Sequence, residues 1–151
     1  MEIYRYKKYE NILQLEKVVF LIKEQMKVIK SKKSENEIEE SLKNALMNDK
    51  RSYLIVCYQT DEPIGFIFGN ISSGLESGKD YFWINEIHVK KDSRRKKLAS
   101  GMIKYLEQWL DGKGIQHVLT MTSKKNIASK ELFDRLEYDE SEVIWIDKYI
   151  K

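Results

Sequence analysis

Cysteine, proline and glycine are scarce in this chain of 151 residues, and each scarcity excludes a class of protein. The single cysteine, Cys57, excludes an intrachain disulfide framework and a zinc site built from several cysteines. One proline, seven glycines and well-spread aromatic residues disfavour intrinsic disorder. No apolar run approaches the roughly 20 residues of a membrane helix, and residues 1–8 lack the apolar stretch of a signal peptide. We therefore expect one globular domain over residues 1–151, located in the cytoplasm and not bound to a membrane.

A strong excess of either charge is also missing. The chain carries 27 basic and 24 acidic residues, which gives a formal net charge of +3 at pH 7. A dedicated nucleic-acid binder usually has a larger and more clustered basic excess, so nucleic acid is disfavoured as a partner. With one cysteine and two histidines in the sequence, we expect no metal cofactor. One basic cluster stands apart, at Arg94–Lys97.

Apolar periodicity predicts an ordered succession of strands and helices. Alternation of apolar and polar residues is typical of strands, whereas apolar residues spaced three and four apart are typical of helices. Ser34 and Glu37 form a capping-box signature at the start of the second helix, and the turn Asp61–Pro63 joins the second and third strands. These elements predict an α/β (α+β) sandwich around a mixed sheet, with all three tryptophans in the core. The predicted strands are 2–8, 53–58, 64–71, 81–90, 115–122 and 143–149. The predicted helices are 10–29, a second helix with its buried stripe at Ile38, Leu42, Ala45 and Leu46, and then 98–110 and 126–136.

The basic cluster Arg94–Lys97 lies between a central strand and the start of a helix. A helix N-terminus carries a partial positive charge, so each exposed cation there is unfavourable by about 0.3–1 kcal/mol unless an anion is bound. The small residues Ala99–Gly101 follow directly, and they leave the backbone amides of the first turn open to a phosphate. The cluster therefore indicates an anion site. The alternative is an ordinary solvated run of charge.

Residues 86–110 resemble the acetyl-CoA-binding motif of the GNAT superfamily of N-acetyltransferases. In that motif a strand ending in Val is followed by Arg-x-x-Gly-x-Gly/Ala and a helix; here Val89 precedes Arg94–Ala99, which reads RRKKLA. A second family motif, Asn-x-x-Ala-x-x-x-Tyr-x-x-x-Gly-Phe, aligns without a gap from Asn126 to Tyr138. The resemblance covers nearly the whole chain. It implies the GNAT-like fold, with a mixed central sheet of about six to seven strands flanked by about four helices.

The resemblance also implies a reaction. Acetyl-CoA, as cosubstrate, and a primary amine would bind together, and the amine would attack the thioester directly, which leaves Cys57 without a catalytic role. Backbone amides of the basic loop would hold the pyrophosphate, and the pantetheine arm would lie beside the 81–90 strand. The residues that the resemblance assigns to the cofactor are Ile87, His88, Val89, Arg94, Arg95, Lys96, Lys97, Leu98, Ala99, Ser100, Asn126, Ser129 and Phe133.

Three positions depart from the family pattern. Lys97 stands where the family prefers Gly, which either loosens the phosphate cradle or adds a charged contact to it. Glu137 replaces the Gly that follows the last helix, and we expect the helix to end in a different way, because a left-handed non-glycine residue costs about 1–2 kcal/mol. Phe133 replaces the Tyr that often protonates the departing thiolate.

Glu86 and His88 are the candidate catalytic residues. Side chains alternate along a strand, so these two lie on one face of the 81–90 strand, where the family often places a general base. A base is needed because an alkylammonium of pKa about 10.4 cannot attack before it loses a proton. The alternative is that Glu86 and His88 bond to each other or to the neighbouring backbone.

The identity of the acceptor stays open at this point. A small amine, an aminoglycoside, an amino acid, and a protein lysine or N-terminus all agree with the sequence. A homodimer is compatible with the resemblance. The competing function is a binding protein of the same fold that holds CoA, or another polyanion such as RNA, without turnover.

Overall fold

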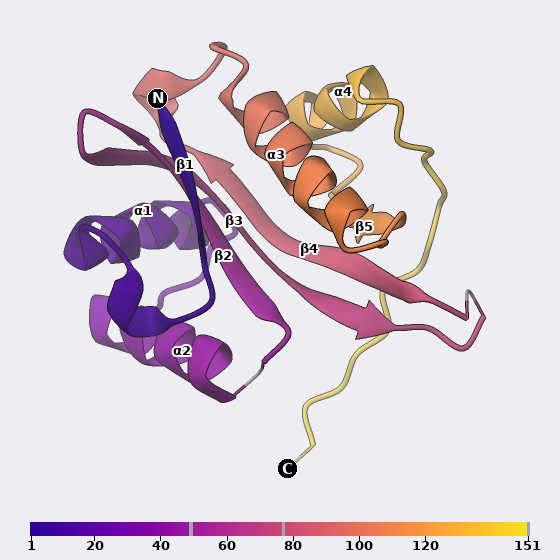
Figure 1. Cartoon of the computed structure of the whole chain (residues 1–151), viewed down its shortest axis with the longest axis horizontal. Coiled ribbons are helices and arrows are strands. Elements are labelled where there is room, and N and C mark those ends of the chain that lie inside the picture. The colour runs from indigo at the N-terminus through magenta and orange to yellow at the C-terminus, as the bar shows by residue number, and fades with distance from the viewer. Residues whose placement is uncertain (49, 77, 151) are drawn as a thin grey trace. The chain divides into compact units, whose positions relative to one another are not determined.

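The computed structural model describes residues 1–48, 50–76 and 78–150, and it separates into two compact units, Met1–Met121 and Thr122–Lys151. The first unit is a five-stranded sheet with helices on both faces (Figure 1). Its strands are β1 (Glu2–Tyr6), β2 (Ser52–Gln59), β3 (Glu62–Ser73), β4 (Asp80–Val89) and β5 (Val118–Thr120). The order follows the chain, with antiparallel pairs from β1 to β4 and a parallel β4–β5 pair. The mixed sheet expected from the sequence is confirmed.

Two helices cover one face of this sheet and one covers the other (Figure 1). Helices α1 (Leu15–Val28) and α2 (Glu35–Asn48) lie on the first face, and α3 (Leu98–Gly112) lies on the opposite face. Short 3-10 turns, η1 (Tyr9–Asn11) and η2 (Lys91–Ser93), precede α1 and α3. The fourth helix, α4 (Ile127–Arg135), belongs to the second unit. In the described part of the chain no helix is long and apolar enough to span a bilayer.

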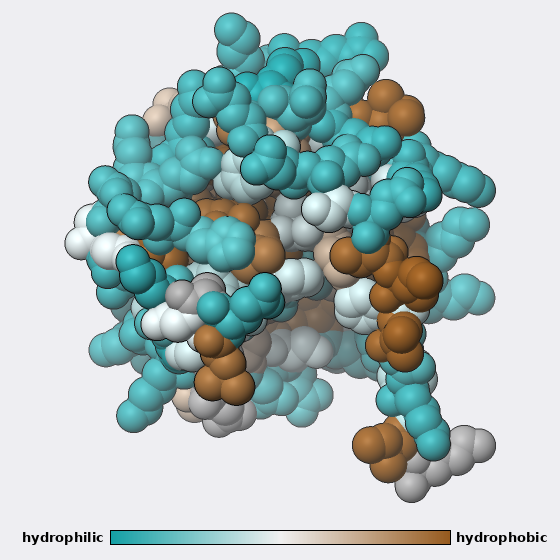
Figure 2. Space-filling view, turned by 90° about the vertical axis from the view of Figure 1, so that its right-hand side faces the viewer, coloured by the Kyte–Doolittle hydropathy of each residue, from teal (hydrophilic) through white to brown (hydrophobic). Residues whose placement is uncertain are grey.

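The sheet has five strands, so the expected count of about six to seven is wrong. The discrepancy lies in residues 143–149, which are rich in the β-branched and aromatic residues typical of strands but pair with no described strand. A strand exists only when a neighbour completes its hydrogen bonds, and residue composition alone does not supply that neighbour. The apolar side chains of this tail are exposed, and they form brown patches along the tail in Figure 2. Trp145, expected in the core, is 67% exposed here.

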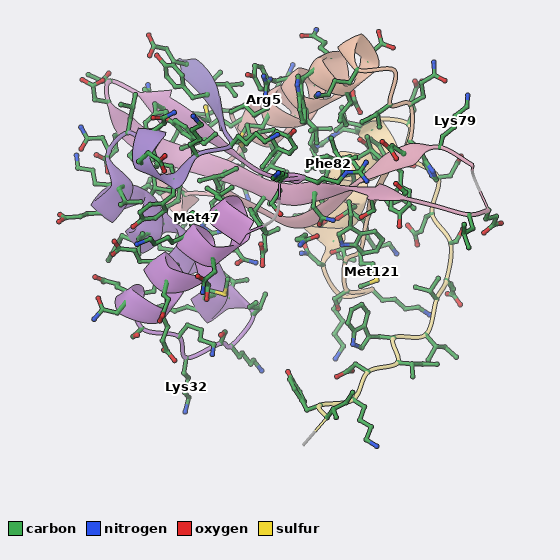
Figure 3. The ribbon with its side chains drawn as sticks, turned by 60° about the horizontal axis from the view of Figure 1, so that its bottom comes forward. Arg5, Lys32, Met47, Lys79, Phe82 and Met121 are labelled. Carbon is green, nitrogen blue, oxygen red and sulfur yellow. The ribbon has the colours of Figure 1, made fainter. Side chains whose placement is uncertain are left out.

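The core lies on both faces of the sheet, and aromatic packing anchors α3. The Trp109 ring meets Tyr53 and Phe82 edge-on, with ring centroids 4.6 and 6.2 Å away, and the Arg5 guanidinium lies 4.4 Å from its centre. Figure 3 labels Arg5 and Phe82, which come from β1 and β4. Fully buried side chains of α3 complete this layer, namely Met102, Ile103, Leu106 and Leu110. The opposite layer joins α1 and α2 to β2 and Phe66.

A two-residue turn connects β2 to β3. Thr60 and Asp61 both have positive φ, 48° and 62°, and Gln59 pairs with Glu62 across them. Positive φ at both central positions is the type I′ geometry, which matches the twist of a hairpin. The expected turn Asp61–Pro63 is therefore displaced towards the N-terminus, and Pro63 lies within β3.

A β-bulge in β4 decides which side chains face which helices. Phe68 pairs with Glu86 and Gly69 with Ile84, so Asn85 is the extra residue. Gly69 is required opposite the bulge, because a Cβ there would overlap the backbone carbonyl of Trp83. A bulge shifts the alternation by one residue. Each side chain of β4 after the bulge, from Glu86 to Val89, therefore lies on the face opposite to the one it would have in an unbroken strand.

Candidate functional site: a basic loop beside an open strand edge

The basic loop Arg94–Lys97 contains two residues with left-handed backbone. Arg94 is extended, with φ −70° and ψ 163°, whereas Arg95 has φ 64° and Lys97, the N-cap of α3, has φ 60°. Lys97 thus adopts the conformation for which the family prefers Gly, although a side chain makes it costly by about 1–2 kcal/mol.

The N-terminus of α3 carries no capping group. Its first turn has no acidic residue, and no side chain accepts a hydrogen bond from it. Among the described residues the amides of Leu98, Ala99 and Ser100 have no acceptor, and the ladder begins with the Gly101 amide donating to Lys97 at 2.9 Å. Unsatisfied amides and the helix dipole together favour an anion at this point.

Arg94 ties this loop to the end of β4. Its Nε donates to the backbone carbonyl of Val89 at 3.0 Å, while the side chain as a whole stays exposed. The side chains of Arg95, Lys96 and Lys97 are also exposed, and no ion pair within the described chain involves them. The loop is therefore an uncompensated cationic surface over an uncapped helix.

The edge of β4 next to this loop has no partner strand. β5 pairs only with the stretch Phe82–Ile84, and the Thr120 hydroxyl donates to the Ile84 carbonyl at 3.1 Å where the pairing stops. The Lys90 amide donates to Ile64 of β3 at 2.8 Å. Because donors alternate in direction along a strand, the amides of Ile87 and Val89 point away from β3, towards the open edge.

Glu86 and His88 lie on the face of β4 that α1 and α2 cover. They pair with Phe68 and Phe66, and both of these side chains belong to that core layer. Glu86 has no hydrogen bond or ion pair within the described chain, and burial raises the pKa of its carboxyl above the usual 4.5. The two side chains therefore do not bond to each other.

His88 is nearly fully buried and faces α1. Its Nε2 has no hydrogen-bond partner in the described part of the chain, and it lies 3.6 Å from Oε2 of Glu24. Burial, and then the positive charge of Arg94, lower the pKa of His88 below 6.5, while the Glu24 carboxylate opposes that shift. No sequence pattern identifies Glu24 as a neighbour of His88, because that position depends on how α1 packs on the sheet.

Ser129 and Phe133 lie on α4 in the second unit, and Asn126 directly precedes the helix as its N-cap. The Asn126 side chain caps the helix by accepting a hydrogen bond from the Ser129 amide at 3.1 Å. The buried Phe133 ring meets Tyr138 edge-on, with centroids 5.1 Å apart. Asn126 and Phe133 of the second motif therefore have structural roles in this helix, Asn126 as its cap and Phe133 through its contact with Tyr138.

Glu137 shows that the expected change in the helix end is wrong. Its φ is 62°, the left-handed value that Gly would adopt. The Tyr138 amide donates to Phe133 at 2.9 Å and the Glu137 amide donates to Asp134 at 3.0 Å, which is the Schellman pattern of a glycine-terminated helix. The helix thus ends in the same turn that the family forms with Gly, and Glu137 adopts the strained left-handed backbone conformation.

Comparisons with known proteins identify the family and the fold. The model of the acetyltransferase (GNAT) family matches residues 14–138. No curated protein matches the sequence. Within the described residues no group of three or more His, Cys, Asp or Glu could hold a metal ion.

Solved structures share the fold at low identity. An aminoglycoside acetyltransferase, meta-AAC0020, from an uncultured soil metagenomic sample and in complex with sisomicin, gives a TM-score of 0.83 at 19% identity, covering 99% of this chain and 96% of that one. The ribosomal-protein-alanine N-acetyltransferase of Brucella melitensis biovar Abortus 2308 gives 0.79 at 11%, covering 99% and 100%. The aminoglycoside N-acetyltransferase AAC(6')-Iy in complex with CoA gives 0.80 at 17%, covering 98% and 93%. The family match spans most of the chain, and the chain belongs to the GNAT acetyltransferase family.

Proposed function

We propose that this protein transfers an acetyl group from acetyl-CoA to a primary amine by direct attack within a ternary complex. The observation that carries the proposal is the uncapped start of α3 beneath an exposed basic loop, next to the unpaired edge of β4. The family match spans both units, and we propose that residues 1–151 act as one cytoplasmic acetyltransferase domain.

The loop and the strand edge have separate roles in this proposal. Amides between Arg94 and Ala99 hold the pyrophosphate, and the side chains of the loop add charge-assisted contacts. The outward amides of Ile87 and Val89 bind the pantetheine arm. The assignment of Asn126, Ser129 and Phe133 to the cofactor rests on the motif and stays a prediction.

Glu86 is the proposed general base. A partly buried carboxylate without a partner holds its proton more tightly than an exposed one, and so it is better matched to taking a proton from an ammonium near neutral pH. His88 is the second candidate, although its lowered pKa makes it a weaker proton acceptor than an ordinary histidine.

The acceptor is best sought among two classes. Solved structures of the same fold include aminoglycoside acetyltransferases and a ribosomal-protein-alanine N-acetyltransferase. We therefore propose aminoglycosides first and N-terminal peptides second, with simple amines and amino acids as further candidates. Release of free CoA thiol, measured with sisomicin, an alanyl peptide and a panel of small amines, tests this choice.

Binding of acetyl-CoA is tested separately from turnover. At a hundredfold excess over Kd, acetyl-CoA should raise the free energy of unfolding by about 2.7 kcal/mol by mass action. No stabilisation and no thiol release with any amine would refute the acetyltransferase proposal. The competing function, RNA binding by the basic loop, would instead appear as RNA affinity that falls steeply with salt.

A further inference from the structure

His88 has an acidic and a basic neighbour that come from different parts of the fold. It is near the end of β4, and only 8% of its surface is exposed. Its Nε2 is 3.6 Å from Oε2 of Glu24 on α1. Arg94 of the basic loop donates to the carbonyl of Val89, the residue directly after His88. A negative neighbour favours a proton on the imidazole, and a positive neighbour opposes it.

The contact between His88 and Glu24 is that of an ion pair that has not formed. His88 Nε2 is buried and has no hydrogen-bond partner within the described residues. The distance of 3.6 Å to the carboxylate exceeds the about 2.7–3.2 Å of an N–H···O bond. A protonated imidazole would donate to Glu24 after a small approach, and the resulting bond would be charge-assisted. A proton on His88 would therefore satisfy a buried nitrogen that is otherwise unpaired.

Arg94 opposes this proton. Its guanidinium is permanently charged and has no acidic partner in the described part of the chain. Burial, and then the Arg94 charge, lower the pKa of His88, and the Glu24 carboxylate only partly offsets them. The imidazole is therefore mostly neutral near pH 7 in the free protein.

The other charges on this face of the sheet offset one another. Glu62 accepts from both Lys17 and Lys90, at 2.7 and 3.5 Å, and Glu16 balances the second lysine in number. Burial raises the pKa of the Glu86 carboxyl, which favours its neutral form. What remains around His88 is the opposed pair of Glu24 and Arg94. The charged groups on this face are Glu16, Lys17 and Glu24 of α1, Glu62 of β3, Glu86 and Lys90 of β4, and Arg94 of the loop.

We propose that an anion bound at the basic loop is coupled to a proton taken up by His88, so that the cofactor binds more tightly as the pH falls. A pyrophosphate on the loop offsets the Arg94 charge, and a proton from the solvent then enters Nε2 and completes the bond to Glu24. The coupling is reciprocal, because an anion that favours the proton is itself favoured by the proton to the same extent. The inference rests on the proposed acetyl-CoA site and adds regulation by pH to it.

The test uses 3′-dephospho-CoA, because the 3′-phosphate of CoA itself titrates near about pH 6 and would hide the effect. Calorimetry with the intact protein, in two buffers of different ionisation enthalpy, gives the Kd and the number of protons taken up. We expect the Kd to fall at least about twofold from about pH 7.5 to about pH 5.5, with proton uptake on binding. A Kd that does not depend on pH, or proton release, would overturn the coupling alone. No binding at any pH would refute the cofactor site and the coupling with it.

NMR observes the imidazole directly. The chain has two histidines, so their signals are readily assigned. Dephospho-CoA should move the midpoint of the His88 titration to higher pH and leave the signals of His117 unchanged. Binding without a change at His88 would contradict the coupling.

Variants separate the two charges. Without ligand, Arg94→Gln should imitate the bound anion and raise the His88 midpoint, whereas Lys91→Gln, which removes a nearby exposed cation, should change it less. Glu24→Gln should lower the midpoint, and the exposed Glu40→Gln should not. His88→Gln should bind dephospho-CoA with a Kd that no longer depends on pH. Circular dichroism checks that each variant is folded. Equal effects of Arg94→Gln and Lys91→Gln, or of the two glutamate variants, would overturn the proposal.

Discussion

The Arg94 guanidinium donates from Nε to the backbone carbonyl of Val89 at 3.0 Å, which joins the basic loop to the last residue of β4. One residue thus supplies a positive charge for the proposed phosphate site and also fixes the loop that holds it. The two contributions can be separated by mutation.

Replacing Arg94 should weaken cofactor binding without slowing the chemistry. The pyrophosphate is remote from the bond that breaks, so we expect Arg94→Ala to raise the KM for acetyl-CoA about tenfold with little change in kcat. Arg94→Lys should recover only part of the loss, because Lys lacks the planar donor array. Lys91→Ala, a nearby exposed cation, is the matched control. A large fall in kcat at unchanged KM would count against this role.

Lys97→Gly should stabilise the protein and preserve cofactor binding. The φ of 60° at Lys97 is strained for a side chain and unstrained for Gly, so the free energy of unfolding should rise by about 1 kcal/mol. We expect the Kd for CoA to stay within about tenfold, a window of about 1.4 kcal/mol, because backbone amides are present in both proteins. Calorimetry measures both quantities. Abolished binding would show that the Lys97 ammonium is a principal ligand.

Glu137→Gly should also be stabilising, by about 1 kcal/mol, because the Schellman turn requires a left-handed residue there. For a chain of this length that change raises Tm by about 2–4 °C. Glu137→Ala is the matched control, since it removes the same charge but keeps a Cβ and should not gain stability. If Ala and Gly stabilised equally, charge and not backbone strain would be the cause.

Glu86→Gln should change both activity and the pH dependence of stability. If Glu86 is the general base, kcat should fall about 10²–10⁴-fold. Since its pKa is raised in the folded state, folded protein retains a proton that the unfolded chain has lost at pH values just above 4.5. Wild-type stability therefore falls as pH rises through that window, and the Gln variant should gain relative to wild type over the same interval. Urea unfolding of both proteins at several pH values measures the difference, and a constant difference would contradict the sign.

Phe133→Tyr should have a modest effect on turnover. A thiol pKa near about 8.5 makes the departing thiolate a weak base that can take a proton from water, so an added hydroxyl is not essential. We expect native protein to acetylate at least one amine and the Tyr variant to raise kcat by no more than about tenfold, or about 1.4 kcal/mol of barrier. Steady-state rates with one responsive amine, from about pH 6 to pH 9, measure this. A hundredfold gain would favour the competing binding function.

Local patterns were sufficient for most of the fold. The capping box of α2 is confirmed, since the Ser34 amide donates to Glu37 at 2.7 Å and the Glu37 amide donates to Ser34 Oγ at 3.2 Å. The helices and the strands up to β5 also follow the predicted order. The capping box and the individual helices and strands depend on residues close together in sequence, and the apolar periodicity of the sequence shows such local relationships directly.

The features that sequence reasoning missed depend on distant neighbours or on tolerated strain. Residues 143–149 have the β-branched and aromatic composition of a strand but pair with no described strand. Glu137 keeps a left-handed conformation that propensity argues against, because the Phe133–Tyr138 contact and two backbone hydrogen bonds offset its cost. The Glu24–His88 approach arises from the packing of α1 on β4, which no local pattern encodes.

Because one edge of β4 is unpaired near its end, the backbone amide hydrogens of this strand should exchange with solvent at alternately slow and fast rates. The Lys90 amide is held by Ile64 of β3, and the His88 amide points the same way, so both should exchange slowly with deuterated water. The amides of Ile87 and Val89 face the open edge and should exchange quickly. A ligand bound along this edge would slow the exchange of the Ile87 and Val89 amides and leave that of the His88 and Lys90 amides unchanged. Exchange rates of single amides would therefore show whether the edge is occupied.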